Sequence, residues 1–549
     1  MSLNQMLQKI SNYIKNMNSG IIFAVAGAVI ILWQMLLPGY VFSLDMVFGP
    51  EFDFVKSAGE FLNALPLEKL LLFADIFLPI WLIQKAILFS LFFLLFYLPF
   101  KFFLFERKWG MDYLTSLFYA INPFVYERFL AGHWLFLFGY ALLPPVLYFL
   151  IKGSGTFPQG LKGSGTFFAR LGLEGSRKRY LIPLKLVFCL TIIGIFSLHM
   201  LTIAIVLSSI YLFGRIVVVL FQKNLSLFKK ILLRTFIAGL VFFFLSSYWT
   251  IPYLVSKNSQ AVFENFNQAH WQTFQTAGDS KLKVFTNVFS LYGYWGEDEP
   301  WAENFVWPKN KLFFLFFLFL ILVLIVFGAF SSWQGFILFC FAGLSLVFAT
   351  GLSGFFPSIN LWIFENISFW RGFRDSAKWV APIALIYAYL IPLGVSFVLE
   401  RVKKIKKEYI LAVVFALPLI YTYPMLFGFQ GQLRSVWYPK EWQEAKEIIE
   451  KDKEDFKILI LPWHGYFSLG FNDNLITGNP GRVFFGPKAV SSKNIELGEL
   501  PSLDPIPDPA DFKYIVYFQD IKDIDPYSYS FLTDFKPLFS KKSIILYKQ

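Results

Sequence analysis

Long apolar stretches alternate with short polar segments along the first 427 residues of the chain. A helix needs about 20 apolar residues to cross the hydrocarbon core of a bilayer, and most of these stretches reach or approach that length. The pattern therefore predicts about eleven transmembrane helices. The third stretch is short and ends at Asn122-Pro123. The eleven stretches fall at 21–37, 82–104, 113–122, 134–151, 183–198, 201–221, 232–254, 311–329, 334–351, 380–399 and 409–427.

The pattern changes near residue 430. Residues 439–452 place a proline before apolar and charged positions at helical spacing, which predicts an amphipathic helix. Short apolar and aromatic runs between Pro, Gly and Asp predict three strands, at 457–462, 513–518 and 543–547. We therefore expect a membrane domain over residues 1–429 and a small α/β domain over 430–549. Within the latter, His464 is isolated, and a structural role or a ligand contact is expected for it.

Composition supports a membrane protein. The chain is 56% hydrophobic and 16% charged, and it contains 70 Phe and 16 Trp. A soluble protein would carry roughly a quarter charged residues. The first apolar run starts near Ile21 with no small-residue cleavage site after it, so no cleaved signal peptide is expected. Cys189 and Cys340 lie inside apolar runs, which indicates core packing and neither a disulfide nor a thiolate metal site.

The distribution of basic residues predicts the orientation. If the N-terminus is cytoplasmic, the inner loops hold 20 Lys and Arg in 89 residues, whereas the outer loops hold 10 in 140. This is the direction of the positive-inside rule, and the run from Arg401 to Lys407 supports it most clearly. An odd number of spans then places the C-terminal domain outside the cytoplasm. The net charge of +12 is explained by these loops, and no nucleic-acid partner is expected.

Polar groups that carry chemistry collect on the outer side in this topology. The outer loops hold fifteen Asp and Glu, against five in the inner loops, and all four histidines also fall on this side. The first outer loop is acidic, with Asp45, Glu51 and Asp53 within nine residues among apolar neighbours. Such a carboxylate can act as a general base toward a hydroxyl group, although solvated loop acids would have the same pattern.

Two further outer segments combine cations with aromatic residues. In one, Glu127, Arg128 and His133 lie between spans, where they can hold a lipid-linked phosphate or close a tight turn as a Glu–Arg pair with an interfacial His. In the other, 370–379, cations and an acid lie among Trp and Phe, which fits either a phosphate site near the headgroup plane or interfacial anchoring. Its charged residues are Arg371, Arg374, Asp375 and Lys378.

The long outer loop 256–310 is rich in aromatic residues. Tyr294 and Trp295 are side chains of the kind that stack on sugar rings. Glu297, Asp298 and Glu299 follow and have oxygen atoms that suit a divalent cation, although consecutive acids seldom bind one ion together. On the inner side, Lys-Gly-Ser-Gly-Thr-Phe occurs at 152–157 and again at 162–167, which is typical of a flexible basic linker.

These segments together resemble the GT-C superfamily of membrane glycosyltransferases, and more narrowly its arabinofuranosyltransferase-like branch. The resemblance rests on the acidic first outer loop, the aromatic mid-chain outer loop, the soluble C-terminal domain and three short motifs. The motifs are Asn122-Pro-Phe with Arg128 and Gly132-His133, Leu291-Tyr-Gly-Tyr-Trp295, and Phe373-Arg-Asp-Ser-Ala-Lys378. No Trp-Trp-Asp signature occurs in the C-terminal domain, which argues against an oligosaccharyltransferase acting on protein sequons.

The resemblance implies a fold, a reaction and a set of site residues. The fold would be a polytopic α-helical, GT-C-like membrane protein with a small extracytoplasmic α/β domain, in the plasma membrane. A sugar would pass from a polyprenyl-phosphate donor to a glycan, lipid or protein acceptor with inversion. The general base would be Asp45, with Glu51 or Asp53 as the less favoured candidates. The substrate would contact Arg128, His133, His199, Tyr294, Trp295, Arg371, Arg374, Asp375 and Lys378.

A required cofactor is not expected; a divalent cation (Mg, Mn or Ca) is left open, and no metal ligands are assigned. Two other functions compete with transfer: a non-catalytic glycolipid-binding or accessory membrane protein, and a transporter or flippase for lipid-linked sugars. Transporters place ionisable residues near the midplane and show repeated halves. Here Lys185 and Arg215 lie toward the inner ends of their spans, and no duplication of spans is evident. Asn366-Ile-Ser368 is a glycosylation sequon on the outer side.

Overall fold

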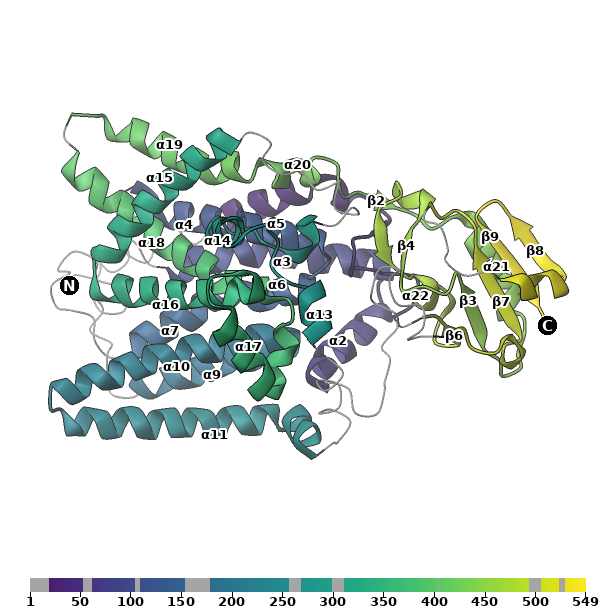
Figure 1. Ribbon diagram of the computed structural model, residues 1–549, viewed down its shortest axis with the longest axis horizontal. Coiled ribbons are helices and arrows are strands. Elements are labelled where there is room, and N and C mark those ends of the chain that lie inside the picture. The colour runs from purple at the N-terminus through teal and green to yellow at the C-terminus, as the bar shows by residue number, and fades with distance from the viewer. Residues whose placement is uncertain are drawn as a thin grey trace, which may run out of the picture.

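The protein is elongated, with a helical body and a sheet domain at one end (Figure 1). The structure is a computed structural model that describes residues 19–52, 62–103, 109–153, 178–255, 268–298, 311–402, 404–492, 505–522 and 529–549. Asp53 and Glu299 lie outside the described residues, as does most of the Gly-rich segment 152–167.

Most helices of the body run along the long axis of the molecule (Figure 1). The helices are α2 (Leu65–Asp75), α3 (Ile80–Phe102), α4 (Met111–Ala120), α5 (Pro123–Leu130), α6 (Trp134–Ala141), α7 (Leu143–Gly153), α9 (Lys178–Phe196), α10 (Leu198–Phe221), α11 (Leu225–Val255), α13 (Gln268–Thr273), α14 (Lys281–Phe289), α15 (Lys311–Phe330), α16 (Trp333–Ala349), α17 (Pro357–Asn366), α18 (Val380–Arg401), α19 (Lys407–Tyr421) and α20 (Leu426–Phe429).

Several of these helices have the length and composition to cross a membrane. Within the described residues six do so, or seven if the bent pair Lys407–Tyr421 and Tyr423–Phe429 counts as one span. The six are Ser19–Leu36, Ile80–Phe102, Trp134–Ile151, Leu198–Phe221, Leu225–Val255 and Ser376–Arg401. Three shorter apolar helices, Leu184–Phe196, Phe314–Phe330 and Gln334–Ala349, also match predicted spans. The prediction of a polytopic helical membrane protein is confirmed.

The stretch predicted as the third span is different in kind. It forms α4, which has ten residues and is buried over most of its length. At 1.5 Å per residue such a helix is about 15 Å long, half of what a bilayer requires. The break at Asn122-Pro123 then starts α5, because Asn122 accepts a hydrogen bond from the Val125 amide (3.1 Å) and proline suits the first helical position. The pair α4–α5 thus ends inside the protein and carries charged residues there.

The central helix α18 packs closely against α15. A Cβ atom at Gly328 of α15 would clash with the Leu390 carbonyl oxygen, and one at Gly394 of α18 would clash with that of Leu324. Glycines at these crossings let the two backbones come close together. In lipid the hydrophobic effect does not drive helices together, so close packing of this kind stabilises their association. In the span that contains α18, 72% of the most apolar stretch is buried inside the protein, whereas in α11 only 6% is. The helix α18 is therefore central and α11 peripheral.

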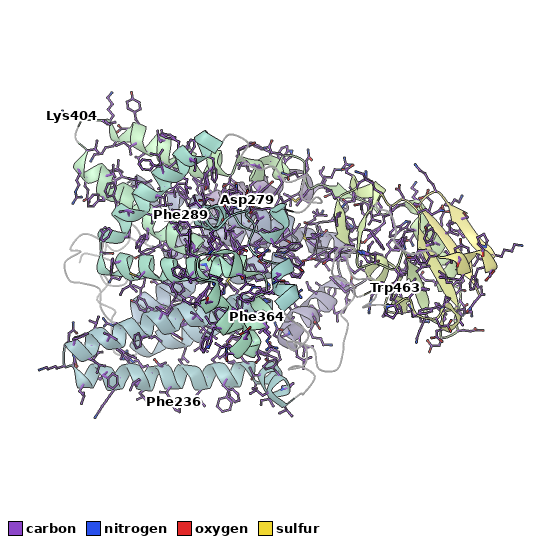
Figure 2. The ribbon with its side chains drawn as sticks, in the orientation of Figure 1. Phe236, Asp279, Phe289, Phe364, Lys404 and Trp463 are labelled. Carbon is purple, nitrogen blue, oxygen red and sulfur yellow. The ribbon has the colours of Figure 1, made fainter. Side chains whose placement is uncertain are left out.

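The outer surface of the body is apolar, as expected for contact with lipid. Phe236 of α11 is 69% exposed and points away from the body (Figure 2). Lys404, from the basic run after α18, lies at the opposite end of the body from Trp463 of the C-terminal domain (Figure 2). Lys404 and the sheet domain therefore occupy opposite ends of the molecule.

The C-terminal domain contains a five-stranded mixed sheet in the order β6-β3-β7-β9-β8. β3 pairs in parallel with β6 and β7, and β9 pairs antiparallel with β7 and β8. A separate hairpin, β4–β5, leaves this sheet. The predicted helix and three strands are confirmed as α21, β3, β7 and β9. The elements are α21 (Lys440–Glu450), α22 (Gly481–Phe485), β3 (Ile458–Leu461), β4 (Tyr466–Ser468), β5 (Ile476–Gly478), β6 (Ala489–Val490), β7 (Tyr514–Phe518), β8 (Pro537–Lys541) and β9 (Ile544–Lys548).

The domain has a core of its own. Trp442 of α21 is buried and stacks on Phe518 of β7, with ring centroids 4.1 Å apart and planes 6° apart. Ala445 and Ile449, one and two turns further along the same face of α21, are buried in the same cluster. This helical stripe explains why an otherwise highly charged segment folds onto the sheet.

Candidate functional site

The site lies where the helical body meets the sheet domain, and α5 supplies its first two charges. Glu127 and Arg128 are adjacent on α5, and both are buried. Arg128 forms a two-point ion pair with Asp375, which contacts Nη1 and lies 3.0 Å from Nη2. Asp375 precedes α18, so the pair joins two segments that were predicted separately. The sequence-based alternative of a Glu127–Arg128 pair is wrong, because the carboxylate paired with Arg128 is that of Asp375.

The Arg128–Asp375 pair is charged. Burial opposes ionisation of the Asp375 carboxyl, but the adjacent Arg128 guanidinium outweighs it and lowers the pKa of Asp375 to about 2. The guanidinium also lies over the ring of Tyr294, 5.0 Å from its centroid. Tyr294 is 1% exposed, so its ring supports Arg128 from within the protein and presents no open face to a sugar in this conformation.

The segment before α18 is held by aromatic packing. Trp370 stacks on Trp379 at 5.2 Å between centroids, and Phe373 packs against both rings. Trp379 is 1% exposed and Trp370 is also buried, so these side chains form core, whereas interfacial anchors would face the headgroups. The alternative of interfacial anchoring is therefore wrong for these two tryptophans, and their packing positions Asp375 and Lys378.

A tight turn after α5 brings His133 to the first outer loop. Gly132 has a φ of +79°, a conformation that residues with a side chain rarely adopt. A Cβ atom here would also clash with the amide of Met46 and lie 2.7 Å from that of Asp45. The Asp45 amide donates a hydrogen bond to the Ala131 carbonyl (3.2 Å). The turn and the loop therefore touch through their backbones.

Asp45 accepts hydrogen bonds at both carboxylate oxygens. His133 Nε2 lies 3.1 Å from Oδ2, and the Tyr466 hydroxyl donates to Oδ1 at 2.8 Å. On the other side of the His133 ring, Nδ1 lies 3.4 Å from Arg128 Nη1. A guanidinium only donates, so Nδ1 is the acceptor and Nε2 carries the proton that is shared with Asp45. Both nitrogens of His133 are thus occupied, and Asp45 is the more exposed member of the pair, at 39% against 20% for His133.

Asp45 is ionised and accessible. Its side chain is 39% exposed. Desolvation by the surrounding protein opposes ionisation, but hydrogen bonds and charge from His133, with Tyr466 and Lys378, lower the pKa of Asp45 below its ordinary value. Asp45 is therefore a charged carboxylate that solvent reaches.

Lys378 is a cation of the site whose ammonium group can still donate hydrogen bonds to a ligand. His199 Nε2 lies 2.7 Å from the Gly372 carbonyl oxygen and must donate its proton there. Lys378 Nζ lies 3.3 Å from the same nitrogen, which therefore has no lone pair to accept from it. Among the described residues no carboxylate lies within ion-pair distance of Lys378 Nζ. The positive charge of Lys378 is nevertheless close enough to Asp45 and Asp375 to help lower the pKa of both carboxyl groups.

The aromatic outer loop closes the site from a further side. The Tyr294 amide donates to the Glu127 carboxyl (3.3 Å), and the Tyr294 and His133 rings meet edge to face. Trp295 packs edge-on against Phe274, and the Arg374 guanidinium lies 4.5 Å from the centroid of the Phe274 ring. The predicted residues Trp295 and Arg374 are therefore joined through Phe274.

Glu127 and Glu297 form a carboxyl pair beneath this loop. Burial, and then the charge and hydrogen bond of Glu297, raise the pKa of Glu127 well above its usual range. Glu127 is consequently neutral, and Glu297 accepts from the Gly293 amide. Of the three acids considered for a cation, Glu297 alone has a described side chain, and it is used in this pairing. Among the described residues no group of three or more His, Cys, Asp or Glu is placed to hold a metal ion.

Two predicted site residues lie elsewhere. Glu51 forms an ion pair with Lys446 of the C-terminal domain at 2.6 Å, which occupies it in domain docking. Arg371 donates to the carbonyl oxygens of Phe364 (3.4 Å) and Glu365 (3.5 Å) at the end of α17, where a cation suits the helix dipole. The placement of both in the site is corrected by these contacts. Asp53 lies outside the described residues.

Tyr466 was missed by the sequence analysis. It follows His464-Gly465 in an apolar segment and carries no motif of its own. The His464 ring nitrogen Nδ1 contacts the backbone of Tyr466, which gives this histidine the structural role expected for it. Only the contact with Asp45, across 421 residues of sequence, identifies Tyr466 as part of the site.

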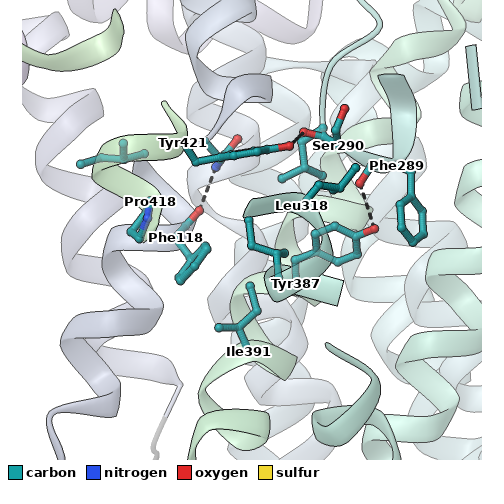
Figure 3. A pocket seen from close by; sticks show the side chains of 12 residues that line it. Phe118, Phe289, Ser290, Leu318, Tyr387, Ile391, Pro418 and Tyr421 are labelled. Atoms are coloured by element: carbon teal, nitrogen blue, oxygen red, sulfur yellow. Dashed lines mark hydrogen bonds between the residues drawn. The ribbon is translucent and has the colours of Figure 1, made fainter. Parts of the chain in front are cut away.

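A narrow apolar pocket lies inside the body, lined by side chains of α4, α15, α18 and α19 and by the turn after α14 (Figure 3). Its polar side chains are all bonded within the protein: Tyr421 donates to Ser290 O (3.0 Å), Tyr387 to Phe289 O (3.1 Å) and Asn122 to Phe118 O (3.0 Å). The pocket therefore offers no free polar group to a ligand. Its tyrosines hold the turn that leads to Tyr294, behind the site.

Comparison with known proteins gives two similar solved structures. No protein-family model matches the chain, and no curated protein matches its sequence. One structure is the arabinofuranosyltransferase AftD from Mycobacteria, with 9% identity, a TM-score of 0.49, and coverage of 97% of this chain and 41% of that one. The other is the oligosaccharyltransferase AglB from Archaeoglobus fulgidus in complex with an inhibitory peptide and a dolichol-phosphate, with 12% identity, a TM-score of 0.34, and coverage of 91% and 65%.

This chain thus spans less than two thirds of the length of either protein.

Proposed function

We propose that this protein is a membrane glycosyltransferase that moves a sugar from a lipid-phosphate donor to a hydroxyl acceptor, with Asp45 as general base. The observation that carries the proposal is that an ionised, 39% exposed carboxylate, that of Asp45, lies within electrostatic range of an open cation, Lys378, at the end of a membrane-spanning body. The arrangement supports deprotonation of an acceptor beside neutralisation of a phosphate.

The proposed reaction is a single displacement with inversion. The acceptor oxygen attacks the anomeric carbon, the bond from that carbon to the phosphate oxygen breaks, and the acceptor proton passes to Asp45. The lowered pKa of Asp45 makes it a weak base, but the acceptor hydroxyl becomes strongly acidic as its oxygen bonds to the sugar carbon. A weak base that is always ionised and held in one orientation therefore suits a late proton transfer.

The leaving lipid phosphate is assigned to Lys378 and Arg374. Lys378 lies within the span Ser376–Arg401, at the end nearest the sheet domain, which corresponds to the headgroup plane. An ammonium with free donors can follow the charge as it develops on the phosphate oxygens. No metal ion enters this scheme. We place the N-terminus in the cytoplasm and the C-terminal domain outside it, in the plasma membrane.

The test compares Asp45→Asn with Glu51→Gln in cells that lack the natural protein. Mass spectrometry of glycolipids and surface glycans identifies the missing product, and its restoration measures transfer. Asp45→Asn should reduce transfer at least about 100-fold, since general base catalysis contributes 10²–10⁴-fold, whereas Glu51→Gln should remain active. Equal amounts of both variants in the membrane control for folding. Near-normal transfer by Asp45→Asn would overturn the proposal and favour the glycolipid-binding accessory function.

A further inference from the structure

The C-terminal domain contacts the body through the loop that carries Asp45. The Glu51 amide donates to the Val483 carbonyl (3.1 Å), and the Tyr438 hydroxyl donates to that of Phe48 (2.8 Å). At its start the loop forms β1 (Tyr40–Val41), which pairs with β2 (Ser435–Val436) at the entrance to the domain. The loop is therefore bordered by the domain along most of its described length.

One element of the domain reaches the base itself. In the β4–β5 hairpin, Tyr466 pairs directly with Gly478. The Gly478 amide donates to the carbonyl of Leu44 (2.7 Å), and the Tyr466 hydroxyl donates to Asp45 Oδ1 (2.8 Å). A single cross-strand pair thus holds the backbone just before the base and one oxygen of the base. A Cβ atom at Gly478 would lie 3.3 Å from Val47, so the hairpin and the loop are in close contact.

We propose that Tyr466 is a positioning residue of the catalytic centre, through which the C-terminal domain sets the orientation of the Asp45 carboxylate. His133 holds Oδ2 from the membrane body, and Tyr466 holds Oδ1 from the domain. With both oxygens fixed, the carboxylate plane cannot rotate, and its remaining lone pairs face the open side of the site. The catalytic consequence rests on the proposed function; the orientation of Asp45 does not.

Tyr466 is suited to this role as a permanent donor. Burial, together with the charge of Asp45 that accepts its proton, raises the pKa of the Tyr466 hydroxyl, so it stays protonated. A hydroxyl that donates to a carboxylate stabilises the ionised form. Removal of this hydrogen bond should therefore make Asp45 easier to protonate and free to rotate.

The experiment uses full-length protein in detergent micelles and a water-soluble carbodiimide with glycine ethyl ester as the probe. Carbodiimides modify protonated carboxyl groups, and peptide mass spectrometry reports each residue separately. Because a hydrogen bond to a charged group corresponds to roughly a tenfold or larger change in equilibrium, Tyr466→Phe should increase labelling of Asp45 about tenfold at a fixed pH above its pKa. The same variant should reduce kcat of transfer with the KM for the donor unchanged.

The chain offers a matched control. Tyr514 of β7 donates to Asp452 Oδ2 at 2.7 Å in the same domain. Tyr514→Phe should increase labelling of Asp452 and leave labelling of Asp45 unchanged. Tyr466→Phe should increase labelling of Asp45 and leave labelling of Asp452 unchanged. A third variant, Tyr438→Phe, removes a docking hydrogen bond that does not touch Asp45 and should leave its labelling unchanged.

Unchanged labelling of Asp45 in Tyr466→Phe would overturn the positioning role. An equal increase in Tyr466→Phe and Tyr438→Phe would also overturn it, because loosened docking would then explain the effect. The labelling assay needs no sugar donor, so its outcome is independent of the proposed function. Conversely, if Asp45→Asn retains transfer while labelling behaves as expected, the proposed function fails and the orientation of Asp45 by Tyr466 stands.

Discussion

Arg128 and Asp375, which lie 247 residues apart in the chain, form a two-point ion pair in which both side chains are buried. Arg128 also contacts His133 Nδ1, and His133 contacts Asp45. Arg128 is therefore linked to Asp45 through two successive contacts, and the ion pair connects α5 to the segment that carries Lys378. A change in the pair should affect both halves of the site.

Loss of one partner of this pair should be strongly destabilising. Asp375→Asn leaves the Arg128 guanidinium buried without a counter-charge, which typically costs about 3–5 kcal/mol. The double variant Arg128→Met with Asp375→Leu should be considerably more stable than Asp375→Asn, because no buried charge remains. Thermal unfolding of the purified proteins in one detergent measures both. Single and double variants that unfold at the same temperature would contradict this account.

The same pair sets an acid limit for stability. The folded pKa of Asp375, about 2, is below the ordinary 3.8, so the stabilisation is complete above pH about 4 and is lost as pH falls toward 2. Between pH 5 and 9 the pair should contribute a constant amount. The difference in melting temperature between wild type and Asp375→Asn should therefore stay constant over that range and shrink below pH 4. A difference that already shrinks between pH 7 and 5 would be inconsistent with a lowered pKa.

Gly132 should tolerate no side chain without loss of activity. Gly132→Ala and Gly431→Ala both place alanine at a left-handed φ, +79° and +81°, with a strain of about 1–2 kcal/mol each. At Gly132 the new Cβ would clash with the loop that carries Asp45, whereas at Gly431 no atom lies within 4 Å. We expect transfer to fall about 100-fold in Gly132→Ala and to change little in Gly431→Ala, since a displacement of about 1 Å can have that effect. Equal activities of the two variants would show that the loop yields.

Lys378 and Arg371 should differ sharply, although both are cations of one segment. Lys378→Gln removes the open ammonium, and one charge-assisted hydrogen bond corresponds to about 1.5–3 kcal/mol, or roughly 10–100-fold in affinity for a lipid phosphate. Arg371→Gln removes contacts to the end of α17 and should leave this affinity unchanged. Titration of each protein with undecaprenyl phosphate, followed by the shift in melting temperature, separates the two. Equal weakening would place Arg371 in the phosphate site after all.

Glu127→Gln should be tolerated and should flatten the pH dependence of stability. The neutral amide can accept from the Tyr294 amide as the protonated acid does. Because the folded pKa of Glu127 is raised, its stabilisation is present below the unfolded value near 4.5 and is lost as pH rises through the folded value. Wild type should lose melting temperature toward alkaline pH more steeply than Glu127→Gln. Parallel curves for the two proteins between pH 6 and 10 would count against a neutral Glu127.

The sequence predicts the broad layout of the site because hydropathy and loop charge determine which segments share an end of the molecule. Asp45, His133 and Asp375 lie on three loops predicted to share one side, and they meet in the structure. The choice between Asp45 and Glu51 was open because both lie in one acidic loop. That choice depends on Lys446, 395 residues away from Glu51, and on how the domain docks.

Other features depend on tertiary geometry that has no local pattern. Arg371 and Lys378 are seven residues apart in one cationic segment. Arg371 donates to a carbonyl at the end of α17, whereas the Lys378 ammonium keeps hydrogen-bond donors available. Tyr294 is a residue type that often stacks on sugars, and Trp370 is one that often anchors proteins at the membrane interface. Both side chains are instead buried in the protein core. The sequence also does not reveal that α4 is too short to cross a membrane, because a short buried helix and a membrane span have equally apolar sequences.

The hydrogen bond between Asp45 and Tyr466 also has a consequence for biosynthesis. The two residues are 421 positions apart, so at 5–20 residues per second the ribosome completes the loop roughly 20–80 s before the hairpin that borders it. During that interval the membrane body can insert, but the Asp45 carboxylate lacks one of its two partners. A chain truncated before residue 466 should therefore never acquire the second hydrogen bond that holds this carboxylate.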